Sequence, residues 1–376
     1  MVDSLELFDD GNHGDSTAGD GIFANYYRPS SEQDLIVEFH IIDTRHYYEG
    51  GIRDWFGIST IPFERIGDIL LINDLDLMPP MGEMNATYYK RGLNRLGYGY
   101  FFWPTYFRGL PTTTELREYL RDGAVIWAGP TSLDRGTLPQ ISYQTPVQET
   151  VALFLDQGGR LLLAGNSIGE MSQFYPLLLR DYIHARYIQT FHRYAYLETL
   201  NGVGGDPIGD GLNLDIIGKP GISQYFAEEI DPTATALSIF YYDTTSGPGQ
   251  IQSSGSGAVR YESDGYRTIF FSFDLSGITD STLLDSVLSR SVRWLIGHGP
   301  GISRYPPEKN RILIRPNPGN PFLIGLSRPD TVSVFDLSGR RIDSLWVVDR
   351  AIWRAPRPGI YFLRVRDQVR KVVVIR

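Results

Sequence analysis

Ser167 stands in a sequence context that can activate a serine hydroxyl. It is the central residue of the run 165–169, GNSIG, which matches G-x-S-x-G and follows an apolar stretch at 161–164. Such a strand-to-helix turn presents a nucleophilic serine at the end of a sheet. The serine also needs a general base within hydrogen-bond reach, and the base needs a group that orients it. Glu170 is a neighbouring acid, but a carboxylate alone is a poor partner for a serine.

The histidines that follow Ser167 give no clear general base. His184 and His192 lie in a stretch rich in Tyr and Arg, and His298 lies in a linker. The glycines of the run 165–169 also have a structural explanation, because they let the chain turn from a buried strand into a helix without backbone strain. We therefore predict that Ser167 belongs to a degenerate site. A hydrolase that depends on Ser167 is the alternative.

Several aspartates could line a ligand cleft beside Ser167. In open α/β sheets, ligands bind outside the carboxyl ends of the strands. The candidate ligand residues are Asp74, Asp76, Asp206 and Asp274. Carboxylates gathered in a cleft could hold Ca²⁺ or Mg²⁺. The alternative, which we favour, is that they are solvated loop acids that cap helices, so no cofactor is expected.

A second group of acids lies near the N-terminus: Asp9, Asp10, Asp15 and Asp20. The group invites a calcium interpretation, but its spacing differs from the EF-hand pattern D-x-[DN]-x-[DN]-G. The stretch resembles a turn motif of extracellular immunoglobulin-like domains. We expect these carboxylates to accept hydrogen bonds from backbone amides in consecutive turns. His13 is then a turn residue and not a zinc ligand.

An aromatic run at 98–106 could form a carbohydrate-binding platform, because six of its nine residues are Tyr, Phe or Trp. Alternation along a buried strand and its exit loop accounts for most of these rings. We therefore predict that they pack in the core.

Composition excludes several classes of protein. The 376 residues are 42% hydrophobic and 21% charged, so the chain can bury real cores and is not disordered. Cysteine is absent, which excludes disulfides, Cys-ligated metal sites and a thiol nucleophile. No apolar run approaches the roughly 18 residues of a membrane helix, so no transmembrane segment is expected. Residues 1–310 hold 22 basic and 39 acidic side chains, which argues against nucleic-acid binding, while 311–376 hold 13 and 5.

Residues 66–298 alternate between apolar runs and helical stretches. The predicted strands are 69–72, 98–103, 124–127, 161–164 and 268–273, and the predicted helices are 83–96, 112–121, 144–157 and 282–296. Short buried strands separated by helices predict a parallel sheet that is covered on both faces. Residues 1–62 are predicted to be part of an immunoglobulin-like β-sandwich whose first strands are missing, and 299–310 to be a linker.

The central region resembles class I glutamine amidotransferases, which have a flavodoxin-like sheet. In catalytic members the turn reads G-x-C-x-G, so Ser167 occupies the position of their cysteine. Those enzymes take their base from a His-x-Glu pair after a late strand. The corresponding segment here is 271–274, FSFD, which has neither His nor Glu. The resemblance therefore implies the fold without the reaction.

The clearest signal lies in residues 311–376. This stretch contains the runs PNP at 316–318, VFDLSGRR at 334–341 and PGIYFLRV at 358–365, and it ends in a basic, β-branched strand. It resembles the C-terminal sorting domain of bacterial type IX secretion, a small immunoglobulin-like sandwich. The residues that carry the resemblance are Pro316, Asn317, Pro318, Asp336, Gly339, Arg340, Gly359 and Tyr361.

This second resemblance implies a route out of the cell. The type IX secretion machinery would recognise the tail, and sortase-like processing would replace it with a surface anchor. The protein would then be secreted or held at the outer-membrane surface. Because this family also needs a signal peptide, we expect one upstream of residue 1.

The sequence as a whole predicts a multidomain protein. An α/β flavodoxin-like three-layer central domain is flanked by an incomplete N-terminal β-sandwich and a C-terminal immunoglobulin-like β-sandwich. The expected function is a secreted or surface-anchored protein whose central domain is non-catalytic and has a binding or scaffolding role. The alternatives are an extracellular serine-dependent hydrolase and a carbohydrate-binding surface module.

Overall fold

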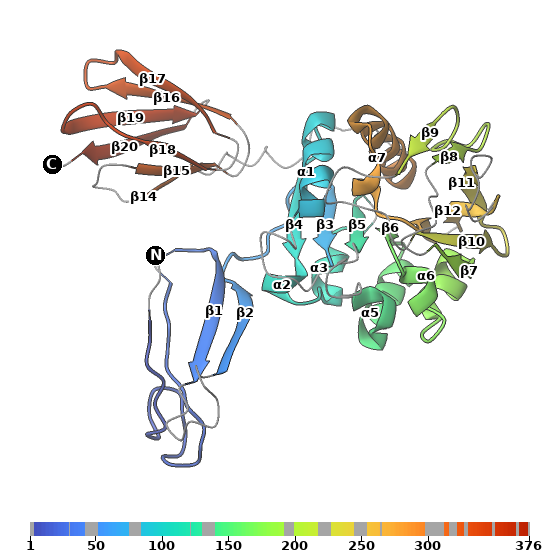
Figure 1. The fold of residues 1–376 in the computed structure, drawn as a ribbon, viewed down its shortest axis with the longest axis horizontal. Coiled ribbons are helices and arrows are strands. Elements are labelled where there is room, and N and C mark those ends of the chain that lie inside the picture. Colours follow the sequence, from blue (N-terminus) through green and yellow to red (C-terminus); the bar gives the residue numbers. More distant parts are fainter. Residues whose placement is uncertain are drawn as a thin grey trace. The chain divides into compact units, whose positions relative to one another are not determined.

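The computed structural model shows a multidomain, mixed α/β chain with several sheets (Figure 1). It describes residues 4–29, 31–41, 52–74, 84–120, 122–129, 140–191, 199–216, 227–243, 254–263, 265–297, 312–315, 322–326, 330–347, 350–365 and 368–374. The chain divides into two compact units, Met1–Gly301 and Ile302–Arg376. Within the described residues, no helix combines the length and the hydropathy needed to cross a bilayer.

Five parallel strands form the centre of the first unit. They are β4 (Tyr100–Pro104), β3 (Ile69–Asn73), β5 (Ala124–Gly129), β6 (Arg160–Gly165) and β13 (Arg267–Phe271), in that order across the sheet. Strands β3 and β5 are buried at every position, as expected for parallel strands that are covered on both faces. The sequence ranges predicted for these strands agree with the observed ones to within two residues at each end.

The sheet continues beyond β13 with antiparallel strands, so the prediction of a parallel sheet is wrong for this half. The further strands are β12 (Ser256–Glu262), β11 (Leu237–Asp243), β8 (Thr199–Gly202), β9 (Asn213–Asp215), β10 (Glu228–Pro232) and β7 (Ala185–Thr190). The connection from β12 to β13 is a short hairpin, which forces antiparallel pairing because a parallel crossover needs a dozen or more residues.

Helices cover both faces of the parallel strands. Alternate residues of one strand belong to different cores: Ile69 and Leu71 lie in one, and Leu70 and Ile72 in the other. The first core includes α1 (Met84–Leu96) and α7 (Ser281–Ile296), and the second includes α3 (Thr113–Arg117), α5 (Thr145–Asp156) and η2 (Leu177–Ile183). The shorter helices are α2 (Thr105–Arg108), α4 (Gln140–Tyr143), α6 (Ile168–Met171) and η3 (Leu275–Gly277). The parallel half of the sheet is therefore the middle of three layers.

The N-terminal segment of the first unit contains one antiparallel pair among its described residues. Strand β1 (Asp34–Ile41) pairs with β2 (Ile52–Ser59), and bends and turns occur between residues 10 and 21. Strand β2 lies against α2, where Gly57 leaves room for Tyr106. Arg108 donates a hydrogen bond to the carbonyl oxygen of Ile61 at 2.7 Å.

The second unit consists of two antiparallel sheets. One contains β14 (Ile312–Arg315), β15 (Phe322–Leu326) and β18 (Arg350–Trp353), and the other contains β17 (Arg341–Val347), β16 (Asp330–Asp336), β19 (Gly359–Val365) and β20 (Gln368–Val374). Ile324 and Trp353 of the first sheet share one core with Val332 and Leu363 of the second. The unit is therefore a two-sheet sandwich with a core of its own.

Candidate functional site

The structure places Ser167 directly after the buried strand β6, as the residue that precedes helix α6. Its backbone adopts φ 58° and ψ 12°, a left-handed conformation that is uncommon for a residue other than Gly. The residue is only 4% exposed. The strand-turn-helix context predicted for the run 165–169 is therefore confirmed, with the serine in a strained backbone position.

A buried carboxylate occupies the amino end of helix α6. The Oε2 atom of Glu228, on β10, accepts a hydrogen bond from the amide of Gly169 at 2.7 Å, and its Oε1 atom accepts one from the amide of Glu170 at 2.7 Å. A Cβ atom on Gly169 would lie 2.9 Å from Oε2, so glycine is what allows this close approach. A carboxyl group of the protein itself thus accepts the hydrogen bonds that the free amides of this helix terminus donate.

Burial has a strong effect on the ionisation of Glu228. The side chain is fully buried, and loss of hydration raises its pKa to about 8, with a smaller contribution from the nearby charge of Glu170. The two amide hydrogen bonds act in the opposite direction, because they stabilise the carboxylate. Glu170 itself accepts a hydrogen bond from the hydroxyl of Thr190 at 2.9 Å, which holds its carboxylate against β7.

No described histidine stands beside Ser167. His184 contacts the hydroxyl of Tyr266 at 3.3 Å and the ring of Tyr261 at 4.0 Å. Tyr261 pairs with Thr268, near the amino end of β13, whereas Ser167 follows the carboxyl end of β6. The two ends of a six-residue strand are separated by about 17 Å, so His184 is too far away to act as a base. His192 and His298 lie outside the described residues.

Asp74 follows the carboxyl end of β3, as predicted, but it is wholly buried. Its Oδ2 atom accepts hydrogen bonds from the indole nitrogen of Trp127 at 2.9 Å and from the amide of Ile141 at 2.8 Å. The side chain therefore joins β3, β5 and α4. Asp76 lies outside the described residues.

Asp274 follows the carboxyl end of β13 and is also buried. It accepts hydrogen bonds from Asn85 at 2.8 Å and from the hydroxyl of Tyr89 at 2.9 Å, both on α1. The amide and hydroxyl of Ser276 donate two more, at 3.0 and 2.7 Å, so Asp274 also caps η3. Burial raises its pKa despite these hydrogen bonds.

Asp206 lies away from this edge of the sheet. It accepts hydrogen bonds from the amides of Ile208 and Gly209 at 2.8 and 3.0 Å, and it forms an ion pair with Arg260 at 2.7 Å. Arg260 lies on β12, which is antiparallel to β13. The structure thus brings Asp74, Ser167 and Asp274 to one edge but leaves Asp206 out. All three described aspartates of the predicted ligand cleft are buried and hydrogen-bonded inside the protein.

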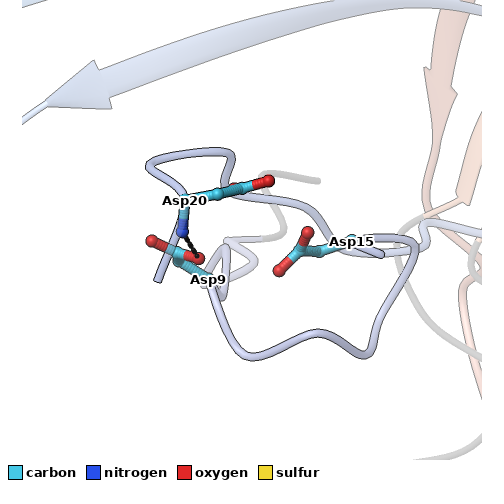
Figure 2. Close-up of side chains that lie close together, drawn as sticks. All are labelled: Asp9, Asp15 and Asp20. Atoms are coloured by element: carbon cyan, nitrogen blue, oxygen red, sulfur yellow. Dashed lines mark hydrogen bonds between the residues drawn. The ribbon is translucent and has the colours of Figure 1, made fainter. Parts of the chain in front are cut away.

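The N-terminal acids form turns, as predicted. Asp9 accepts hydrogen bonds from three amides between residues 19 and 21, and Asp15 accepts from Gly11 and Thr17. Figure 2 shows Asp9, Asp15 and Asp20 close together, and one carboxylate oxygen of each lies within 4.8 Å of those of the other two. His13 contacts Asp10 at 3.0 Å and has φ 52°, so it is a turn residue. Within the described residues, this is where three possible oxygen ligands come together.

The aromatic run at 98–106 contributes to the core. Tyr98, Phe101 and Trp103 are 3–6% exposed, and the indole nitrogen of Trp103 donates to the carbonyl oxygen of Gly109 at 2.8 Å. The core-packing prediction is confirmed for these three rings. They offer no flat, exposed platform for a sugar.

The described residues of the C-terminal motif shape turns and the core. Asp336 accepts hydrogen bonds from the amides of Ser338 and Arg340, and the Ser338 hydroxyl helps to lower the pKa of Asp336. Gly339 has φ 79° in the same turn, and Gly359 begins β19 with φ 154°. Tyr361 donates to the carbonyl oxygen of Arg357 at 2.9 Å and lies edge-on to Trp353. Pro316, Asn317 and Pro318 lie outside the described residues.

Sequence reasoning missed Glu228, although it is the acid that contacts the Ser167 turn. In the sequence it stands in AEEI, residues 227–230, next to a second glutamate. A single charge in a short strand usually faces water, and nothing in the sequence marks this one as inward-facing. Its role depends on the pairing of β10 with β7, which is not a local property of the chain.

No family model matches the chain, and no curated protein matches it. Among solved structures, a β-galactosidase from Bacillus circulans sp. alkalophilus is similar at a TM-score of 0.42 and 13% identity, over 77% of this chain and 41% of that one. A carbohydrate deacetylase gives a TM-score of 0.38 at 13% identity, over 77% and 38% of the two chains. PorZ, a surface component of the type IX secretion system of Porphyromonas gingivalis, matches 17% of this chain and 11% of its own at 21% identity and a TM-score of 0.16. The chain thus spans about two fifths or less of these proteins, and likeness at this level assigns no activity.

Proposed function

We propose that this chain is a secreted or surface-anchored bacterial protein whose amidotransferase-like central domain is non-catalytic and serves in binding or scaffolding. Export would depend on the C-terminal sandwich, as the resemblance of residues 311–376 to a type IX sorting domain implies. The observation that carries the non-catalytic part is the hydrogen bonding of Glu228 to the amides of Gly169 and Glu170.

This carboxyl group opposes the charge development that a serine nucleophile requires. Acyl transfer develops a negative charge on the substrate oxygen, and backbone amides next to the nucleophile stabilise that charge. Here two of the amides that follow Ser167 already donate to a carboxylate. A developing oxyanion beside these two amides would meet a negative charge when Glu228 is ionised, and neither amide would be free to donate to it.

The distance to a base supports the same proposal. Ser167 is 4% exposed, and the described histidine that follows it, His184, lies at the other end of the sheet. Glu170 is hydrogen-bonded to Thr190 and is itself an acid, so it does not supply a base of the required strength.

Labelling with a serine-reactive fluorophosphonate tests the proposal. The full chain should show no label above the level of the Ser167→Ala variant, because an unactivated hydroxyl does not attack the probe. The Glu228→Ala variant should also remain unlabelled, since it frees the amides but adds no base. Labelling of the wild-type chain that is lost in Ser167→Ala would contradict the proposal and favour the hydrolase.

A further inference from the structure

An open cavity of about 330 Å³ lies at the edge of the sheet opposite to Ser167. It is bounded by the turn between α5 and β6, which contains Gly158, and by the β12–β13 hairpin, which contains Ser263 and Gly265. The two turns approach closely, because a Cβ atom on Gly158 would lie 3.2 Å from the carbonyl oxygen of Gly265. Side chains from the first residues of β6 and β13, Arg160 and Arg267, complete the wall.

Two arginines stand side by side in this cavity. Arg160 and Arg267 are direct partners in the parallel pairing of β6 with β13, so their side chains leave the sheet on the same face. Neighbouring strands are about 4.8 Å apart, and like charges at this spacing repel each other. This repulsion adds to the loss of hydration in lowering the pKa of Arg160.

The two guanidinium groups differ in how their charges are balanced. Arg267 forms an ion pair with Glu262, and it donates to the carbonyl oxygens of Trp294 and Leu295 at the carboxyl end of α7. Arg160 has no hydrogen bond or ion pair with its guanidinium among the described residues, and its Nη1 atom is shut off from solvent without an acceptor.

Asp122 does not line the cavity, but its negative charge acts to raise the pKa of Arg160. The carboxylate of Asp122 is itself paired with another cation. It lies 3.0 Å from the Nη2 atom of Arg65. Among the described lining residues, two positive charges therefore face the single carboxylate of Glu262. Counted over the described lining residues alone, one positive charge remains, and it belongs to a partly desolvated guanidinium, which is the group best suited to bind a planar or tetrahedral oxyanion.

We propose that this cavity binds a small, polar oxyanion, with Arg160 as its principal contact. The cavity is large enough for a monosaccharide acid or a phosphate. The lining is polar, so the ligand carries hydroxyl or other polar groups beside its charge. This site is independent of Ser167 and Glu228, and it does not rest on the proposed non-catalytic role.

Isothermal titration of the full chain at low salt tests the proposal, with D-glucuronate and inorganic phosphate as probes and D-glucose as the neutral control. At least one of the two anions should bind at millimolar concentration or below, and glucose should not. Arg160→Met keeps the length of the side chain and removes the charge, so it should weaken binding about tenfold or more. Arg186→Met is the matched control, because Arg186 is an exposed strand arginine paired with Asp231.

A second variant tests the charge balance from the other direction. Glu262→Gln removes the carboxylate that faces Arg267, while the carbonyl oxygens of Trp294 and Leu295 still hold that arginine in place. This variant should bind the anion more tightly than the wild type. The proposal is overturned if neither anion binds the wild-type chain, if Arg160→Met binds as well as the wild type, or if Glu262→Gln weakens binding.

Discussion

The buried Glu228 is an acid whose ionisation opposes folding. In the folded chain its pKa is raised to about 8 from the ordinary value of 4.5. Between these two values the folded state therefore binds more protons than the unfolded state does. The free energy of unfolding must fall as the pH rises through this window, because the proton that stabilises the folded form is lost.

We expect this effect to amount to as much as about 1 kcal/mol per pH unit in urea unfolding between pH 5 and 8. Glu228→Gln should remove most of the slope, although it should be less stable than the wild type at pH 5, because its amide group presents a donor to one of the two backbone amides. Glu229→Gln changes the adjacent acid, which bonds to Gln189, and should keep the wild-type slope. Equal slopes in Glu228→Gln and the wild type would contradict the assignment.

At the scale of elements, Asp274 connects the end of β13 to helix α1. It bonds to Asn85 and Tyr89 on that helix and caps η3, with every partner partly or wholly buried. Asp280 offers a comparison, because it also caps a helix, α7, but its hydrogen bond to the amide of Thr282 is exposed. The two aspartates thus differ in burial and in the bonds that join Asp274 to helix α1.

We expect Asp274→Ala to lower the free energy of unfolding by about 3 kcal/mol, since it leaves buried donors without an acceptor. Asp280→Ala should lower it by about 1 kcal/mol, the usual value for an exposed helix cap. Chemical denaturation of both variants measures the difference. Similar losses in the two variants would show that Asp274 is no more than a local cap.

The pattern of apolar residues in the sequence predicts the strands that are buried along their whole length. It misses the strands whose hydrogen-bonded partners lie far away in the sequence. Strands such as Ile69–Asn73 and Arg160–Gly165 are short apolar runs between helical stretches, and they are found where expected. The predicted helix 112–121 shortens to α3, Thr113–Arg117, with turns after it. Strands β7 and β10 alternate less clearly, and their partners lie about 40 residues away in the chain. The antiparallel half of the sheet, and Glu228 with it, therefore had no local signal.

The candidate site was predictable only in outline. G-x-S-x-G indicates the turn at Ser167, and the end of each apolar run indicates the position of Asp74 and Asp274. Whether such an acid faces solvent or bonds inward depends on tertiary neighbours, such as Trp127 for Asp74 and Tyr89 for Asp274. Those neighbours are more than 50 residues away in each case, so sequence spacing does not reveal them.

At the scale of the whole molecule, each unit has its own hydrophobic core. The buried residues of the second unit form a cluster between Ile324 and Val374, and those of the first unit form two clusters between Ile69 and Ile296. Each unit therefore has the internal packing that independent folding requires.

We expect a chain that ends at Gly301 to keep the thermal transition of the first unit within about 2 °C. In a bacterium with type IX secretion, the same truncation should abolish surface delivery, because it removes the whole module that resembles a sorting domain. Calorimetry and surface immunolabelling measure the two effects separately. Normal delivery of the truncated chain would contradict the sorting role, and a large fall in the transition temperature would contradict separate folding.

The two-core sheet has a consequence for how the strands find their alignment. Because β3, β5 and β6 are apolar on both faces, sliding one of them by a single residue would exchange one aliphatic surface for another and expose almost nothing polar. The free energy of hydrophobic burial therefore changes little when a strand slips by one residue. The hydrogen bonds of Asp74 to Trp127 and Ile141 exist only in the native alignment. The hydrogen bonds of the buried Asp74 thus select one strand register among several that bury similar amounts of hydrophobic surface.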